Sequence, residues 1–258
     1  MKKNIAALLM TQNDYLAEAK LIINKLNESD IKDHFKCYFA CKNVDLEDKE
    51  LNWNKIDIDK NCKTWGSEIL YSLNLIKEEY VLILLDDFYP IKKFSAMLLK
   101  KTIENSLKYK PSLIRINSNY NRRILLQKKE KNIFEESYLH KYSTSLVLPV
   151  FKKEFLERII FKKDSPWLFE RYSNNRFNFK SHTFLFIKGR EINFSVVNIV
   201  VRGELLRSSL FRIKNSKKLN YIQNTKKSKK PYLKEILFHL KKLFSDLFMR
   251  YMPYFKLN

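Results

Sequence analysis

The stretch Glu79-Tyr-Val-Leu-Ile-Leu-Leu-Asp86-Asp87-Phe88-Tyr-Pro90 joins a continuous apolar run to two adjacent carboxylates. The run from Tyr80 to Leu85 is typical of a strand that is buried on both faces of a sheet. Two acids at the end of such a strand are costly unless positive charge meets them. Ligands of open α/β sheets bind at the carboxyl ends of the strands, so a metal-bound phosphate compound is one interpretation. The other is a turn in which Asp86 and Asp87 cap the following segment.

The segments around this strand alternate between strand and helix patterns. Apolar runs predict strands at 5–10, 35–40 and 112–117, and a further one within 53–58. Apolar residues at helical spacing predict helices at 14–26, 64–77 and near 94–108. This alternation predicts an α/β fold with a mainly parallel central sheet in three layers.

The second half of the chain is less regular. β-branched and aromatic residues predict strands at 143–151, 183–188 and 192–201. A short helix is expected at 154–160, and another begins in Ser165-Pro-Trp-Leu-Phe-Glu170, because proline is tolerated in the first turn of a helix.

Composition narrows the class of protein. A chain of 258 residues with 45% hydrophobic residues is expected to fold as one large domain with or without an appendage. Only 3 glycines are present, which excludes glycine-rich phosphate loops, so side chains and a metal would have to hold a nucleotide. The net charge of +22 favours a polyanionic partner, whether nucleic acid, anionic membrane or phosphorylated substrate.

Cysteine usage and the start of the chain indicate a cytosolic protein. The three cysteines form no CxxC pair, so neither a disulfide framework nor a zinc site is expected. The apolar run near the start is too short for a signal peptide, and no segment approaches 18 apolar residues. We therefore expect a soluble or peripheral membrane protein.

The composition changes after about residue 212, which divides the chain into a domain at 1–212 and a tail at 213–258. The segment 214–230 is rich in lysine and contains no acidic residue, which is typical of a solvated linker. From Leu233 to Tyr251 apolar residues recur at spacings of three and four, which predicts an amphipathic helix. This helix suits either an anionic membrane surface or packing on the main domain or a second subunit.

Several separated motifs carry a resemblance to a known family. They are Leu8-Leu-Met-Thr11-Gln-Asn13-Asp14, Thr64-Trp65-Gly-Ser-Glu, the Asp86-Asp87-Phe88 strand end, Tyr142-Ser143-Thr-Ser145-Leu, Phe151-Lys-Lys-Glu-Phe-Leu156, Ser165-Pro166-Trp167-Leu-Phe-Glu170 and Val201-Arg202-Gly203. In this order they resemble a group of bacterial glycosyltransferases with a GT-A-like fold from capsule and lipopolysaccharide synthesis. The resemblance spans about 4–207. Phe151, Thr144, Val147 and Gly66 depart from the family's usual residues, and these departures bear on the expected acceptor pocket more than on the expected fold.

The resemblance implies roles for particular residues. Asp87 and Asp86 would hold Mn²⁺ or Mg²⁺, which neutralises charge on a departing phosphate. Donor contacts would come from Thr11, Asn13, Trp65, Asp86 and Arg202, and acceptor contacts from Trp167 and Ser145. Arg202 could also be structural, and Trp65 could simply belong to the core.

Glu170 is the expected general base that deprotonates the acceptor hydroxyl in an inverting transfer. The alternative for Glu170 is a surface ion pair with Arg171 or Arg176.

The function expected from the resemblance is metal-dependent transfer of a sugar from a nucleotide sugar, with a UDP-sugar favoured. The acceptor would be a glycan or a lipid-linked molecule in surface polysaccharide synthesis. The enzyme would be cytoplasmic and peripheral on the inner face of the cytoplasmic membrane. The alternative is a non-catalytic basic protein that binds nucleic acid or acts as a scaffold, but no nucleic-acid-binding signature is present.

Overall fold

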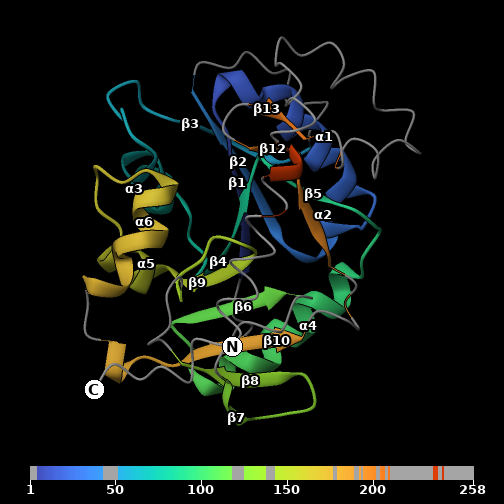
Figure 1. Ribbon diagram of the computed structural model, residues 1–258, viewed down its shortest axis with the longest axis vertical. Coiled ribbons are helices and arrows are strands. Elements are labelled where there is room, and N and C mark those ends of the chain that lie inside the picture. The colour runs from blue at the N-terminus through green and yellow to red at the C-terminus, as the bar shows by residue number, and fades with distance from the viewer. Residues whose placement is uncertain are drawn as a thin grey trace.

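The computed structural model describes residues 5–42, 52–117, 125–137, 143–176, 179–188, 192, 194–201, 204–206, 209, 235–237 and 240. Its centre is a nine-stranded sheet in the order β3-β2-β1-β4-β9-β6-β10-β8-β7 (Figure 1). The strands are β1 Ile5–Met10, β2 Lys36–Cys41, β3 Asn54–Asp57, β4 Tyr80–Leu85, β6 Leu113–Asn117, β7 Leu125–Lys128, β8 Ile133–Glu136, β9 Pro149–Lys152 and β10 Phe184–Lys188. Only β9 and β8 run against the others, so the expected mainly parallel sheet is confirmed.

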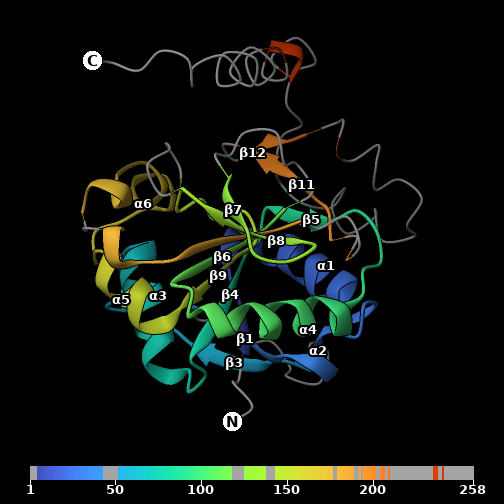
Figure 2. The ribbon, with the colours of Figure 1, turned by 90° about the horizontal axis from the view of Figure 1, so that it is seen from below.

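Helices cover both faces of this sheet, which confirms the three layers (Figures 1 and 2). One face carries α1 Leu16–Asn27, α2 Ile31–His34 and α4 Ala96–Ser106, and the other carries α3 Trp65–Leu75, α5 Lys153–Ile159 and α6 Pro166–Tyr172. In β1 the side chains alternate between the two layers of core: Ala7 and Leu9 join the first, Ala6 and Leu8 the second. A strand that is apolar throughout is therefore buried on both faces.

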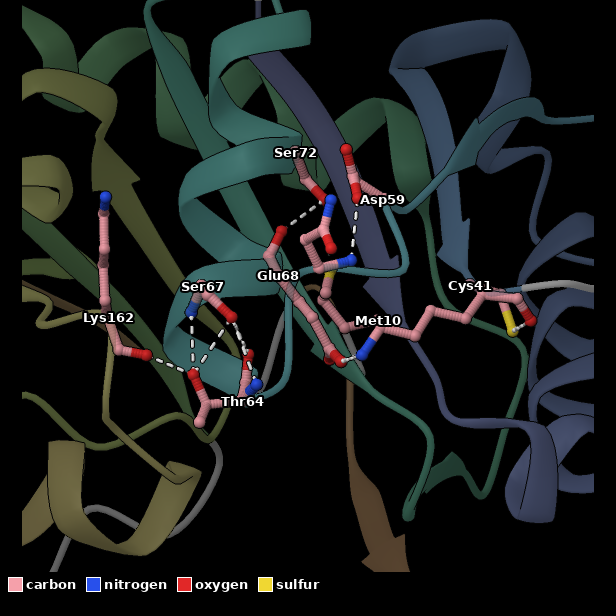
Figure 3. Close-up of polar contacts among 10 residues, drawn as sticks. Met10, Cys41, Asp59, Thr64, Ser67, Glu68, Ser72 and Lys162 are labelled. Atoms are coloured by element: carbon pink, nitrogen blue, oxygen red, sulfur yellow. Dashed lines mark hydrogen bonds and ion pairs between the residues drawn. The ribbon is translucent and has the colours of Figure 1, made fainter.

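The capping box at the start of α3 shows how the sequence sets a helix boundary. The Thr64 side chain accepts a hydrogen bond from the Ser67 backbone N–H, and the Ser67 side chain accepts one from the Thr64 backbone N–H (Figure 3). These two bonds satisfy donors that a helix leaves free in its first turn. The helix ends at Leu75, two residues before the expected Lys77.

The second half of the chain differs from the expectation in three places. The predicted strand at 143–151 is confirmed only from Pro149, and the resulting β9 lies antiparallel between β4 and β6. The region 192–201 forms the short strands β11 Val196–Asn198 and β12 Val200–Val201, which pair with β5 Phe88–Pro90 and β13 Glu204–Leu205 respectively. The β7–β8 pair was not predicted.

Most of the predicted tail at 213–258 lies outside the described residues. Glu235, Ile236, Leu237 and Leu240 are helical, and the last three of these side chains are exposed. Within the described part of the chain, no helix has the length and apolar character needed to cross a membrane.

Candidate functional site

The topological switch point of the sheet lies at the carboxyl ends of β1 and β4. From β1 the chain adds β2 and β3 on one side and then returns to place β4 on the other side. Ligands of open α/β sheets bind at such a switch point. Thr11 and Asp86, the residues that follow β1 and β4, are joined here by a 2.8 Å hydrogen bond from the Thr11 hydroxyl to Asp86 Oδ2.

Asp87 is the second carboxylate at this edge, and its environment is unusual. Its Oδ1 atom is buried without a hydrogen-bond partner among the described residues. Burial, followed by the negative charges of Asp86 and Glu170, raises the pKa of Asp87 to about 7. A buried carboxylate oxygen that lacks a donor is a position at which a cation would be stabilised.

A divalent cation fits this pair of carboxylates. Mg²⁺ in proteins is commonly bound through one or two carboxylates together with substrate phosphates and water. Asp86 and Asp87 supply that number of carboxylates at the switch point. Within the described residues no group of three or more His, Cys, Asp or Glu side chains forms a complete metal site. The remaining ligands of a metal here would therefore include phosphate or water oxygens.

Glu170 lies on α6 and faces inward. Its Oε1 accepts hydrogen bonds from the Leu146 backbone N–H at 2.6 Å and from the Ser145 hydroxyl at 3.1 Å. Burial raises the pKa of Glu170, although these two hydrogen bonds oppose the shift. Because Glu170 also raises the pKa of Asp87, the two carboxylates share one electrostatic environment.

The surface ion pair considered for Glu170 is not formed with Arg176. That guanidinium binds Asp164 instead, donating to both carboxylate oxygens. Ser145, expected at the acceptor, lies against Glu170 and donates its hydroxyl to it.

The segment that leads into α6 is in direct contact with the start of α3. Ser165 caps α6 by accepting a hydrogen bond from the Leu168 N–H, and the Gly66 N–H donates to the Asp164 carbonyl at 2.9 Å. A Cβ atom at Gly66 would lie 2.1 Å from the Phe161 carbonyl oxygen, so only glycine fits this close approach. The contact fixes the position of the helix that carries Glu170.

Trp65 lies in the core between these helices. Its ring packs on Phe169 with centroids 5.6 Å apart, and the residue is 8% exposed. The indole Nε1 is buried without a partner among the described residues. The burial and ring packing of Trp65 agree with the core alternative, and its contact with a donor stays a prediction.

An ion pair between α3 and the residue that follows β2 was not predicted. Glu68 is buried on α3, and its side chain extends toward the ends of β1 and β2, where Met10 and Cys41 lie (Figure 3). It forms an ion pair with Lys42 Nζ at 2.5 Å. In the sequence Glu68 stands out only as the last residue of the motif Thr64-Trp65-Gly-Ser-Glu, and nothing in the spacing indicated Lys42 as its partner.

A third pair is buried inside the sheet. Arg115 of β6 binds Glu136 of β8, and their side chains are 2% and 0% exposed. Arg115 alternates with Ile114 and Ile116, which face the α1 layer, so it faces the layer that contains α6. Its positive charge opposes the rise in the pKa of Glu170.

The other predicted contacts are only partly described. Trp167 is 71% exposed on the outer side of α6. Asn13 lies in the 3₁₀ turn before α1, but its side chain is outside the described part. Arg202 also lies outside the described residues.

Comparison with known proteins shows the fold. No protein-family model matches the chain, and no curated protein matches it. S. aureus TarS 1–349 in complex with UDP is 16% identical with a TM-score of 0.52, over 99% of this chain and 73% of that one. A longer S. aureus TarS chain is 14% identical with a TM-score of 0.51, over 97% of this chain and 44% of that one. These likenesses support the GT-A-like fold expected from the sequence.

Proposed function

We propose that this protein is a metal-dependent glycosyltransferase that uses a nucleotide-sugar donor. The observation that carries the proposal is the buried Oδ1 of Asp87, which has no partner within the described part of the chain and follows Asp86 at the switch point of the sheet. A nucleotide diphosphate with its divalent cation supplies the positive charge and the oxygen ligands that this arrangement lacks. A UDP-sugar is favoured because the S. aureus TarS structure that shares the fold contains UDP.

The cation would be Mn²⁺ or Mg²⁺, held by Asp87 with help from Asp86. When bound, it neutralises negative charge on the departing diphosphate. Thr11 fixes the Asp86 carboxylate through the bond across β1 and β4. The switch point thus combines a fixed carboxylate with one whose buried Oδ1 has no hydrogen-bond partner among the described residues.

Glu170 is the proposed general base. It would accept the proton of the acceptor hydroxyl while that oxygen bonds to the anomeric carbon and the bond to the diphosphate oxygen breaks. Burial raises the pKa of Glu170, which makes the carboxylate a better proton acceptor. The hydrogen bonds from Ser145 and Leu146 hold one carboxylate oxygen in place. Attack opposite the leaving group would invert the anomeric centre.

The proposed acceptor is a glycan or lipid-linked molecule of bacterial surface polysaccharide synthesis, such as a capsule or lipopolysaccharide precursor. Ser145 lies against Glu170 and donates its hydroxyl to it. Trp167, the other predicted acceptor contact, belongs to the same helix as Glu170, with its ring exposed on the outer side. An acceptor of this kind places the enzyme in the cytoplasm at the inner face of the cytoplasmic membrane.

The test is release of nucleotide from a panel of UDP-, GDP- and CMP-sugars with Mn²⁺ or with EDTA. We expect one donor to be turned over slowly by water in the presence of Mn²⁺ only. Asp87→Asn should abolish turnover and weaken nucleotide binding. Glu170→Gln should retain nucleotide binding but lower turnover by roughly 10²-fold or more, since it removes a general base.

Glu104→Gln is the matched control, because Glu104 is exposed on α4 in the opposite helical layer. It should leave turnover unchanged. A folded wild-type protein that neither binds nor turns over any member of the panel would contradict the proposal.

A further inference from the structure

The outer side of the segment 161–172 exposes large apolar side chains. Phe161 is 52% exposed, Trp167 71%, Leu168 43% and Tyr172 40%. Soluble proteins rarely gather exposed aromatic side chains in one place without a partner. Four exposed large apolar residues, three of them aromatic, lie within twelve consecutive positions, and they therefore indicate an interaction surface.

The exposed charged side chains of the same segment are all basic. Lys162, Lys163 and Arg171 are exposed. Of its two acids, Asp164 is buried against Arg176, and Glu170 accepts hydrogen bonds inside the site. We call the exposed apolar and basic side chains of 161–172 the aromatic–basic face.

The C-terminal part of the aromatic–basic face lies on α6, the same short helix that carries Glu170. In α6 Phe169 and Glu170 point inward, whereas Trp167, Leu168 and Arg171 point outward. Arg171 also lies over the Tyr172 ring at 5.2 Å. In Figures 1 and 2, α6 lies with α3 and α5 at one side of the sheet.

We propose that the aromatic–basic face docks on the surface of an anionic lipid bilayer. Tryptophan and tyrosine are favoured at the boundary between headgroups and acyl chains, and lysine and arginine are attracted to anionic lipids. Docking through α6 would bring Glu170 next to the bilayer, where a lipid-linked acceptor is presented. The contact itself needs no donor and no transfer reaction, so it can be tested separately from the proposed function.

Charge and chemistry favour a bilayer over the other polyanion considered, a single-stranded nucleic acid. Nucleic-acid sites stack bases on aromatic rings that line a basic groove. Here the Trp167 and Tyr172 rings are exposed on the outer side of α6, and Leu168 adds apolar area that offers no stacking surface. An apolar interface surrounded by cations matches the headgroup region of an anionic bilayer.

Trp167 is a natural reporter of this contact. The chain has 3 tryptophans, and the other two, Trp53 and Trp65, are 6% and 8% exposed. The full-length protein would be mixed with vesicles of phosphatidylcholine alone, or with about 30% phosphatidylglycerol, with and without brominated acyl chains. We expect the anionic vesicles alone to shift the fluorescence to shorter wavelength, and the brominated chains to quench it. Trp167→Phe should still sediment with the vesicles but lose both signals.

A charge variant tests the basic half of the face. Lys162→Glu combined with Lys163→Glu should weaken vesicle binding by at least about tenfold, since each lysine near the surface contributes to attraction. Lys92→Glu combined with Lys101→Glu is the control, because it changes the net charge equally at exposed positions in and beside α4. We expect it to have a much smaller effect, since salt screens charges that are far from the bilayer.

Several results would overturn the inference. Vesicles that bind without any change in Trp167 fluorescence would place the contact elsewhere in the chain, for example in 213–258. Equal binding to neutral vesicles would remove the role of the basic residues. The same fluorescence change with a single-stranded oligonucleotide at lower concentration would assign the face to nucleic acid.

Discussion

The Thr11 hydroxyl donates a 2.8 Å hydrogen bond to Asp86 Oδ2 and so connects the ends of β1 and β4. Thr11→Val keeps the shape of this buried side chain but removes the donor. We expect a loss of stability of about 1 kcal/mol and weaker binding of UDP with Mn²⁺. Calorimetric titration of the nucleotide checks this, and Thr11→Ser, which retains the hydroxyl, should bind nearly as wild type. Unchanged affinity in Thr11→Val would show that Asp86 needs no support from β1.

The raised pKa of Asp87 predicts a particular dependence of stability on pH. An acid with a higher pKa in the folded than in the unfolded chain stabilises the fold when protonated. For Asp87 this contribution is complete below pH 3.8, the ordinary value, and is lost as the pH rises through about 7. In EDTA at pH 8, Asp87→Asn should therefore be more stable than wild type by on the order of 1 kcal/mol or more.

Chemical denaturation at several pH values measures this difference for Asp87→Asn. The gain should shrink toward pH 5, where the wild-type carboxyl is protonated. Asp33→Asn, at an exposed position on α2, should show little change at either pH. A loss of stability in Asp87→Asn at pH 8 would mean that the carboxylate has a stabilising partner.

The buried Arg115–Glu136 pair predicts strong coupling between two strands that are not neighbours. Arg115→Met leaves Glu136 buried without its partner and should cost roughly 3–5 kcal/mol. The double variant with Glu136→Leu should recover most of that loss, because no uncompensated charge remains. A double-mutant cycle by urea denaturation tests this coupling, and additive losses would contradict it.

The close approach at Gly66 predicts an effect opposite to helix propensity. Alanine is normally favoured over glycine within a helix by about 1 kcal/mol. Gly66→Ala should nevertheless destabilise, because its Cβ would lie 2.1 Å from the Phe161 carbonyl. Asn74→Ala, at an exposed position of the same helix, is the control and should be neutral or stabilising. Thermal denaturation separates the two, and a stabilised Gly66→Ala would contradict the contact.

Much of the sheet could be predicted because its strands are locally distinctive. The runs that form β1 and β4 are apolar without interruption, and the Thr64 cap marks the start of α3. The position of β9 could not be predicted, since its antiparallel insertion between β4 and β6 depends on pairing between distant segments. The β7–β8 pair was missed because its two strands are short and contain charged and polar residues, so that neither forms an apolar run.

In the candidate site, too, the residues that could be predicted are those marked by their local sequence, and contacts between distant segments could not be predicted. Asp86 and Asp87 could be identified because two acids follow a buried strand. The structure brings Asp87 and Glu170 into one electrostatic environment. The Lys42–Glu68 and Arg115–Glu136 pairs join residues far apart in the chain, and charged residues are too frequent here for spacing to reveal such partners.

The most direct test of the central claim is a thermal-shift titration with UDP, GDP, CDP and CMP, each with and without Mn²⁺. Wild type, Asp87→Asn and the Asp33→Asn control would be compared. A ligand at about 100 times its dissociation constant should add roughly 2.7 kcal/mol to the stability of the folded state. We predict that one nucleotide, UDP, stabilises wild type and the control only with Mn²⁺, and does not stabilise Asp87→Asn. Stabilisation by no nucleotide, or an equal response in Asp87→Asn, would contradict a metal-dependent nucleotide site at the end of β4.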